Sequence, residues 1–146
     1  MTDMAVPADE TGLLAAGWKP YPKSGGFEDH VGPIYHNRTP EGRMRFGFRC
    51  LRHHINPQGV VHGGMLVTFI DHVLGGLVWY RIGKKPCLTV SLNCDFVASA
   101  KQGDWVEGQG ELVRQGKSLV FVRGLLTAND RAVLRASGIW KIIGAN

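Results

Sequence analysis

In residues 56–71, NPQGVVHGGMLVTFID, a polar, glycine-rich loop leads directly into an apolar segment that carries a carboxylate, and the rest of the fold is organised around this segment. Residues 65–80 are nearly all apolar and include no proline. After this segment, Arg81 supplies a cation for the last turn of a helix, Gly83 suits the end of the helix, and Pro86 prevents its continuation. The sequence therefore predicts one long helix over residues 65–80. Because its apolar residues cover every side, we expect this helix to be buried on all sides.

The predicted helix starts beside His62, Gly63 and Gly64. The first N–H groups of a helix have no partner within the helix, and glycine lets atoms of another group approach them closely. Such a helix start suits a carbonyl oxygen that becomes negatively charged during a reaction. We expect His62 to hold the loop and the helix start by hydrogen bonding, with proton transfer as the alternative role.

Length and composition favour one ordinary domain. The chain has 146 residues, enough to bury a substantial core. Residues 1–10 lack a basic, apolar signal region, so we expect a disordered leader at 1–10, a single domain at 11–146 and a cytoplasmic location. The helix is shorter than about twenty residues and contains Asp71 and His72, so we predict no membrane span. The three cysteines lack Cys-x-x-Cys spacing and fit reduced thiols.

The charge balance favours anionic partners. Seventeen Lys and Arg against twelve Asp and Glu make the chain basic. The basic residues are scattered singly, and only Lys84 and Lys85 are adjacent. No clustered stripe for nucleic acid is visible, so we expect a phosphorylated small molecule and no nucleic acid.

The segments before the helix predict a short helix and a hairpin. Residues 11–18 favour a short helix with Leu13, Leu14 and Trp18 on one side. Residues 33–38 and 43–51 favour two strands joined by a turn at 39–42. In the second strand, apolar residues alternate with arginines and Gly47, which predicts one buried and one solvated face.

The segments after the helix predict four long strands. From Leu88 to Phe96 the even-numbered residues are apolar and the odd-numbered ones polar, so we expect the even-numbered face to be buried. Residues 104–114, 118–128 and 132–143 favour an antiparallel meander with short hairpin turns. We therefore predict an α+β fold in which a single sheet bends around one helix. Such a sheet hides one side of the helix well, so a second subunit is the simplest further cover.

Asn56, Gly59, His62-Gly63-Gly64 and Asp71, with helix and strands in this order, resemble the hotdog-fold acyl-CoA thioesterases, particularly the phenylacetyl-CoA (PaaI) type. The resemblance covers residues 43–143 and rests on the spacing Asn-x5-His-Gly-Gly-x6-Asp, together with Asn93 and the stretches 100–101 and 103–104. It implies an antiparallel sheet wrapped around one central helix. It also implies hydrolysis of acyl-CoA, without a cofactor, by homodimers that assemble into a homotetramer.

The resemblance also implies roles for single residues. Asn56 and the N–H of Gly63 would hold the thioester carbonyl, while Asp71 activates water or attacks directly. Thr89 stands where some members use a hydroxyl to orient the water. The candidate substrate contacts are Gly64 at the helix start, two aromatic residues that are otherwise core residues, and two lysines that otherwise form a solvated helix end: Gly64, Phe69, Phe96, Lys84 and Lys85.

Physical chemistry supports this assignment independently. Thioester hydrolysis needs an oxyanion site and a base for water, and the chain offers both. Gly63 and Asp71 are eight residues apart, or about 12 Å along a helix, too far for both to reach one carbonyl carbon. We therefore expect a site shared between the two subunits of an isologous dimer.

Other interpretations stay open at this point. Asp71 could pair with an arginine, and Asn56 could only make a turn. The histidines show no zinc spacing, and Cys94 falls on the apolar face of its strand, so we expect neither a metal site nor a cysteine nucleophile. The rival functions are a non-catalytic acyl-CoA binding module, a hotdog dehydratase or hydratase that uses His62 and Asp71, and a nucleic-acid binder, which the scattered charges disfavour.

Overall fold

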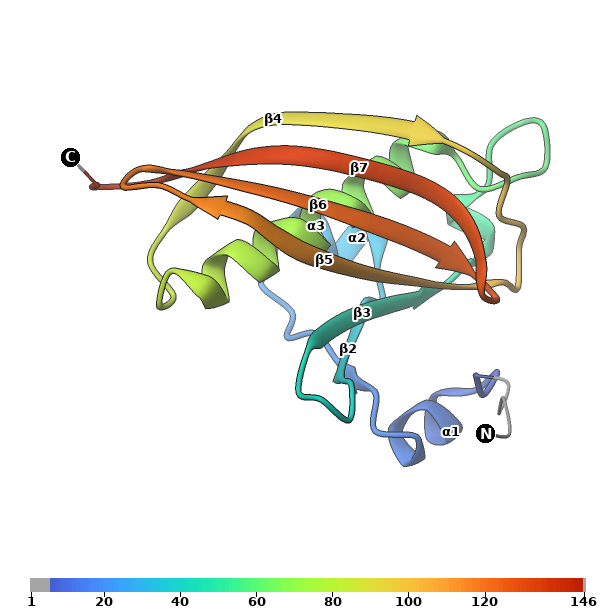
Figure 1. Ribbon diagram of the computed structural model, residues 1–146. Coiled ribbons are helices and arrows are strands. Elements are labelled where there is room, and N and C mark those ends of the chain that lie inside the picture. The colour runs from blue at the N-terminus through green and yellow to red at the C-terminus, as the bar shows by residue number, and fades with distance from the viewer. Residues whose placement is uncertain (1–5, 146) are drawn as a thin grey trace.

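The computed structural model describes residues 6–145 of the chain. The elements are α1 (Glu10–Ala15), β1 (Lys19–Pro20), α2 (Phe27–Val31), β2 (Tyr35–Arg38), β3 (Met44–Arg49), a 3-10 turn (Arg52–His54), α3 (Gly63–Arg81), β4 (Cys87–Phe96), β5 (Trp105–Gln115), β6 (Leu119–Ala128) and β7 (Arg131–Ile142). The strands form one seven-stranded antiparallel sheet in the order β1-β2-β3-β5-β6-β7-β4. The sheet curves around α3 (Figure 1). The predicted α+β hotdog architecture is confirmed.

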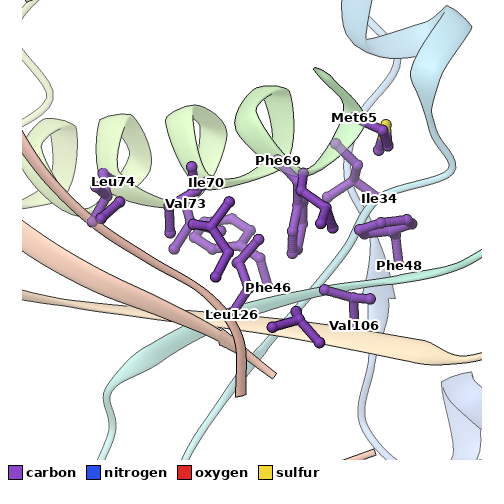
Figure 2. Packing of buried hydrophobic residues seen from close by; sticks show 14 of the residues in the cluster. Ile34, Phe46, Phe48, Met65, Phe69, Ile70, Val73, Leu74, Val106 and Leu126 are labelled. Atoms are coloured by element: carbon purple, nitrogen blue, oxygen red, sulfur yellow. The ribbon is translucent and has the colours of Figure 1, made fainter. Parts of the chain in front are cut away.

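The core lies between α3 and the concave face of the sheet. Figure 2 shows Phe69 and Val73 of α3 pointing toward Phe46 of β3 and Leu126 of β6, with Leu74 farther along α3 at the left. All five side chains are almost completely buried. Burial of one such side chain contributes roughly 1.5–3 kcal/mol, so this face holds the helix on the sheet.

The other side of α3 is not covered in the single chain. Val67, Asp71, Gly75 and Trp79, spaced four residues apart, are only half-buried and form a stripe along the helix. The expectation of burial on all sides is therefore wrong for one chain, because the sheet covers one face only. By length and composition α3 would also suit a membrane span, as do many core helices, and here its apolar face packs on the sheet.

Glycines set the distance between the helix and its neighbours. A Cβ on Gly110 of β5 would lie 2.7 Å from a methyl group of Leu74, and one on Gly76 of α3 would lie 2.9 Å from the ring of Phe46. Side chains at these positions would therefore push α3 away from the sheet. At the Gly75–Gly76 pair of α3 the close neighbours are aromatic rings, Phe46 at Gly76 and Trp140 at Gly75.

The predicted hairpin of β2 and β3 is present, but the face of β3 that we expected to be solvated is covered. Leu13, Trp18, Tyr35 and Trp105 form a second, smaller buried cluster there. The guanidinium groups of β3 stack on its indoles, Arg45 over Trp18 at 4.8 Å and Arg49 over Trp105 at 5.2 Å. The arginines that indicate a solvated face in the sequence thus cover aromatic rings.

The N-terminal region is packed where the structure describes it. Residues 1–5 of the predicted leader lie outside the described residues. Asp9 caps α1 by accepting a hydrogen bond from the N–H of Gly12 at 2.9 Å, and Val6 packs on the second cluster. The short helix therefore begins at Glu10, and Leu14, expected to face the domain, is exposed.

Strand β4 departs from its predicted alternation. Leu92 and Cys94 pack on the core as predicted, but Leu88 and Val90 are 63% and 58% exposed. The pairing of β4 with β7 shifts between Thr89 and Ser91, which is a β-bulge. The extra residue in the bulge changes which face each following side chain points to. Residues before and after the bulge that a regular strand would place on opposite faces therefore lie on the same face.

The predicted meander is confirmed as β5, β6 and β7. Its last turn uses Asn129 and Asp130 at φ values of 47° and 67°, the left-handed geometry that favours a tight hairpin. Strand β4 lies outside this meander, next to β7 at the edge of the sheet, as Figure 1 shows. This position leaves one side of β4 without a strand partner within the described chain.

Candidate active site

The central contact of the site joins α3 to β4. The Thr89 hydroxyl donates a hydrogen bond of 2.7 Å to Oδ1 of Asp71. Asp71 is half-buried and Thr89 is exposed. Among residues 6–145, no hydrogen-bond partner is found for the other carboxylate oxygen of Asp71, Oδ2. A carboxylate held by one oxygen and free at the other can receive a proton from a water molecule.

Asp71 and Thr89 line a groove of about 450 Å³ between α3, β4 and β7. Trp79 and Trp140 line it as well, together with Cys87. Burial, and after it the nearby charge of Asp71, raises the pKa of Cys87. Burial, the charge of Asp95 and that of Asp71 raise the pKa of Cys94 in the same way. Both shifts favour the thiol over the nucleophilic thiolate, which leaves the carboxylates of Asp71 and Glu28 and the imidazole of His72 as the basic groups of this groove.

At the start of α3, His62 acts as the cap. Its Nδ1 accepts a hydrogen bond of 2.8 Å from the N–H of Gly64, and its carbonyl accepts one from Met65. The N–H of His62 itself donates to the carbonyl of His54. Within the described chain this leaves the N–H of Gly63 without a partner. Gly63 therefore carries the available donor, whereas the N–H of Gly64, a predicted substrate contact, is occupied.

The Asn56 side chain holds the loop that precedes the helix. Its Oδ1 accepts hydrogen bonds from the N–H groups of Gln58 and Val60, at 3.0 and 3.2 Å. The amide nitrogen Nδ2 has no partner in the part of the chain that the structure describes. The turn role and the carbonyl-binding role are thus compatible, because they use opposite ends of one amide.

These residues form two half-sites in one chain. The bridge between Ile55 and Val61 brings Asn56 back toward the helix start, and we call Asn56 and Gly63 the loop half-site. Asp71 and Thr89 are the helix half-site, and neither Asn56 nor Gly63 lines their groove. Eight residues of α3, about 12 Å, separate Gly63 from Asp71. One chain therefore does not assemble the four groups around one carbon.

The two predicted aromatic contacts differ in position. Phe69 is fully buried, and its ring packs on that of Phe48 at 4.7 Å, so it is a core residue and not part of a substrate surface. Phe96 is exposed at the end of β4. A Cβ on Gly63 would lie 3.1 Å from the Phe96 ring, which places this ring beside the loop half-site.

Lys84 and Lys85 are exposed directly after α3. The Lys84 ammonium group lies 5.5 Å from the ring centre of Trp79, a residue of the groove wall, and 5.8 Å from that of Tyr80. The Lys84 ammonium group therefore lies close to the groove. The contact of Lys84 and Lys85 with a phosphate stays a prediction.

The sequence reasoning missed one polar pair of the groove. His72 lies next to Asp71 in α3, and its Nδ1 is 2.8 Å from Oε1 of Glu28 in α2. Both residues line the groove. A histidine within an apolar helix is the signal that points to this pair, but its partner is 44 residues away, so no local pattern reveals it.

The fold and this site define a thioester hydrolase of the hotdog type, and comparison with known proteins agrees. The sequence pattern of the Thioesterase superfamily matches residues 58–134, and the chain belongs to this family. The matched range includes Gly63, Asp71 and Thr89 and begins two residues after Asn56. The predicted enzyme class is confirmed, and so is the resemblance in fold to PaaI-type thioesterases.

Two relatives cover most of the chain. One is a Pseudomonas aeruginosa protein whose name places it among the esterases; it is 30% identical over 127 residues, which are 86% of this chain and 95% of that protein. The other is human acyl-coenzyme A thioesterase 13, which is 26% identical over 116 residues, 80% of this chain and 83% of the relative.

Two solved structures share the fold. A mutant of the phenylacetic acid degradation protein PaaI from Thermus thermophilus has a TM-score of 0.71 at 19% identity, covering 80% of this chain and 98% of that chain. A hypothetical thioesterase from Streptococcus pneumoniae with bound coenzyme A has a TM-score of 0.69 at 23% identity, covering 77% and 90%.

Proposed function

We propose that this protein hydrolyses acyl-CoA thioesters to a free acid and coenzyme A, at a site that two copies of the chain share. The observation that carries the proposal is the Thr89–Asp71 hydrogen bond in an open groove, with the second carboxylate oxygen free. A base positioned in this way in a groove open to substrate suits the attack of water on a carbonyl carbon.

In this reaction Asp71 takes a proton from water while the water oxygen bonds to the thioester carbon. The Thr89 hydroxyl keeps the carboxylate oriented and offers its own oxygen to the same water. Asn56 Nδ2 and the Gly63 N–H stabilise the negative charge that develops on the carbonyl oxygen. The tetrahedral intermediate then expels the thiolate of coenzyme A, which takes up the proton from Asp71. Direct attack by Asp71, through an anhydride that water later cleaves, is the alternative.

The edge of the sheet supports the shared site. Strand β4 has an open edge and exposes apolar side chains along its length, including Leu88, Val90 and Phe96. Long exposed edges tend to pair with another strand. A second copy packed against this edge and the open stripe of α3 would bring its loop half-site to the helix half-site of the first. Isologous symmetry would create two such sites in each homodimer, and we retain the homotetramer as a pair of these dimers.

Acyl-CoA is the substrate class that several facts favour together. A human relative is named an acyl-CoA thioesterase, and a structural neighbour holds coenzyme A. The chain carries a formal net charge of +5, which attracts the anionic phosphates of coenzyme A. Lys84 and Lys85, exposed close to the groove, are the proposed phosphate contacts.

A panel of aromatic and straight-chain acyl-CoAs tests the proposal, with thiol release as the measurement. We expect the wild-type protein to turn over at least one of them, and Asp71→Asn to remain folded while losing most turnover. Tight acyl-CoA binding without thiol release would identify a binding module instead. Undiminished hydrolysis by folded Asp71→Asn would reject Asp71 as the base or nucleophile.

A further inference from the structure

Residues 20–33, here named the covering segment, include α2 and contact α3 through Tyr21 and Glu28. The N–H of Tyr21 donates to the carbonyl of Ile34 at one end of the segment. At the other end, ring nitrogens of His54 and His53 lie 2.6 and 3.0 Å from the carbonyl oxygens of Val31 and Gly32. Both ends of the segment are thus held by hydrogen bonds to the domain.

The middle of the covering segment is held by His72. The His72 side chain is only 7% exposed, and its Nδ1 lies 2.8 Å from Oε1 of Glu28. The imidazole packs edge-to-face with the rings of Tyr21 and Phe46, at 4.6 and 4.9 Å. Because His72 directly follows Asp71 in α3, this contact places Tyr21 and Glu28 beside the helix half-site.

Tyr21 and Glu28 form one wall of the groove that contains Asp71 and Thr89. Burial, with the charge of Glu28 as the second cause, raises the pKa of the Tyr21 hydroxyl. Both side chains, one aromatic and one acidic, contact the imidazole of His72. Trp79 of α3 and Trp140 of β7 also belong to the lining.

The chemistry of the lining decides which part of a thioester fits the groove. A thioester carbon within reach of Asp71 carries two substituents, the acyl group and the sulfur of coenzyme A, and one of them must extend into the groove. The described lining contains the acids Glu28 and Asp71 and three large aromatic rings, but no lysine or arginine. The aromatic rings suit an apolar group, and the phosphates of coenzyme A, which the uncharged pantetheine arm separates from the thioester, would lie outside the groove beside Lys84 and Lys85. The acyl group is therefore the part that fits.

We propose that Tyr21 and Glu28, held in place by His72, determine which acyl groups the protein accepts. Tyr21 limits the bulk of the acyl group by closing the groove from the side of the covering segment. Glu28 disfavours acyl groups that carry their own carboxylate. This inference rests on the proposed function, and it restricts the substrate class to uncharged acyl groups of limited bulk.

The experiment compares kcat/KM for three classes of acyl-CoA: short straight-chain, bulky aromatic and succinyl. Tyr21→Ala should raise the ratio of bulky to short substrates about tenfold, the size of effect that one or a few carbon atoms have in an apolar pocket. Glu28→Gln should raise the ratio of succinyl to short substrates, because it removes a charge and keeps the shape. Phe27→Ala is the matched control, because Phe27 is exposed on the same helix and does not line the groove.

A second variant at residue 21 keeps the test decisive if Tyr21→Ala does not fold. Tyr21→Leu keeps an apolar contact with Phe46 and shortens the side chain, so it should shift the bulk preference in the same direction. Unchanged ratios in folded Tyr21→Leu and Glu28→Gln would overturn the inference, as would an equal shift in Phe27→Ala. Failure of the proposed function is distinguishable, because the wild-type protein would then release no thiol from any of the three classes.

Discussion

The Thr89 hydroxyl and the Asp71 carboxylate meet across 2.7 Å, and this bond connects the edge strand β4 to the middle of α3. Thr89 reaches α3 just before the β-bulge, while Leu92 after the bulge packs on the core. A regular strand would place these two residues on opposite faces. The bulge therefore lets one strand contribute both a polar group to the site and apolar groups to the core.

Thr89→Val should lower kcat by about 10²-fold, because valine keeps the branched shape that strands favour but has no hydroxyl to orient Asp71. Thr89→Ser, which keeps the hydroxyl, is the control and should stay within a few-fold of wild type. Steady-state kinetics with one acyl-CoA measures both. Equal activities of the valine and serine variants would show that the hydroxyl has no part in turnover.

The Asn56→Asp variant tests the role of the amide nitrogen Nδ2 separately from that of the amide oxygen Oδ1. The aspartate still accepts the hydrogen bonds from Gln58 and Val60, so the loop should stay folded. It has no N–H to donate to the thioester oxygen, so kcat should fall by about 10²–10³-fold with a smaller change in KM. Asn56→Ala should lose thermal stability as well. A normal kcat with only a raised KM in Asn56→Asp would argue against oxyanion binding.

Mixed dimers test the shared site. Asn56→Asp and Asp71→Asn subunits, each inactive alone, are exchanged by co-expression, with two tags to confirm mixing. If each site takes its loop half-site from one chain and its helix half-site from the other, a mixed dimer has one intact site. Random pairing makes about half the dimers mixed, so about a quarter of wild-type activity should return. Mixed dimers without any gain in activity would place each site within one chain.

His62→Ala should destabilise the protein by about 1 kcal/mol, because the N–H of Gly64 loses its cap. His62→Asn offers another side-chain acceptor and should keep most of this stability. Urea unfolding measures the difference, and thiol release is followed in parallel. Retained turnover in folded His62→Asn is the expected result for a capping role, whereas a large loss of kcat in both variants would indicate proton transfer by His62.

Much of the fold is predictable because it depends on local patterns. The long apolar segment, ended by Arg81 and Gly83, predicts α3 to within two residues at its start and one at its end. The turns at residues 39–42 and 129–130 mark two hairpins, which the structure confirms. Local periodicity predicts burial incorrectly at the bulge of β4 and on the outer face of β3, because burial there depends on elements distant in the sequence.

The residue types and spacing of the candidate site also come from the sequence alone. Asn56, Gly63 and Asp71 are near one another in the chain, and helix geometry already separates Gly63 from Asp71 by about 12 Å. The sequence thus determines one central helix, an antiparallel sheet and two half-sites that one chain does not join.

Only the tertiary structure decided which groups meet across the sheet and the helix. Strand β4 pairs with β7 rather than with its neighbours in the chain, and its bulge turns Thr89 toward Asp71. The covering segment reaches α3 through Glu28, which contacts His72 across 44 residues of sequence. Such contacts depend on strand order and on the burial of distant surfaces, for which a single sequence carries no local signal.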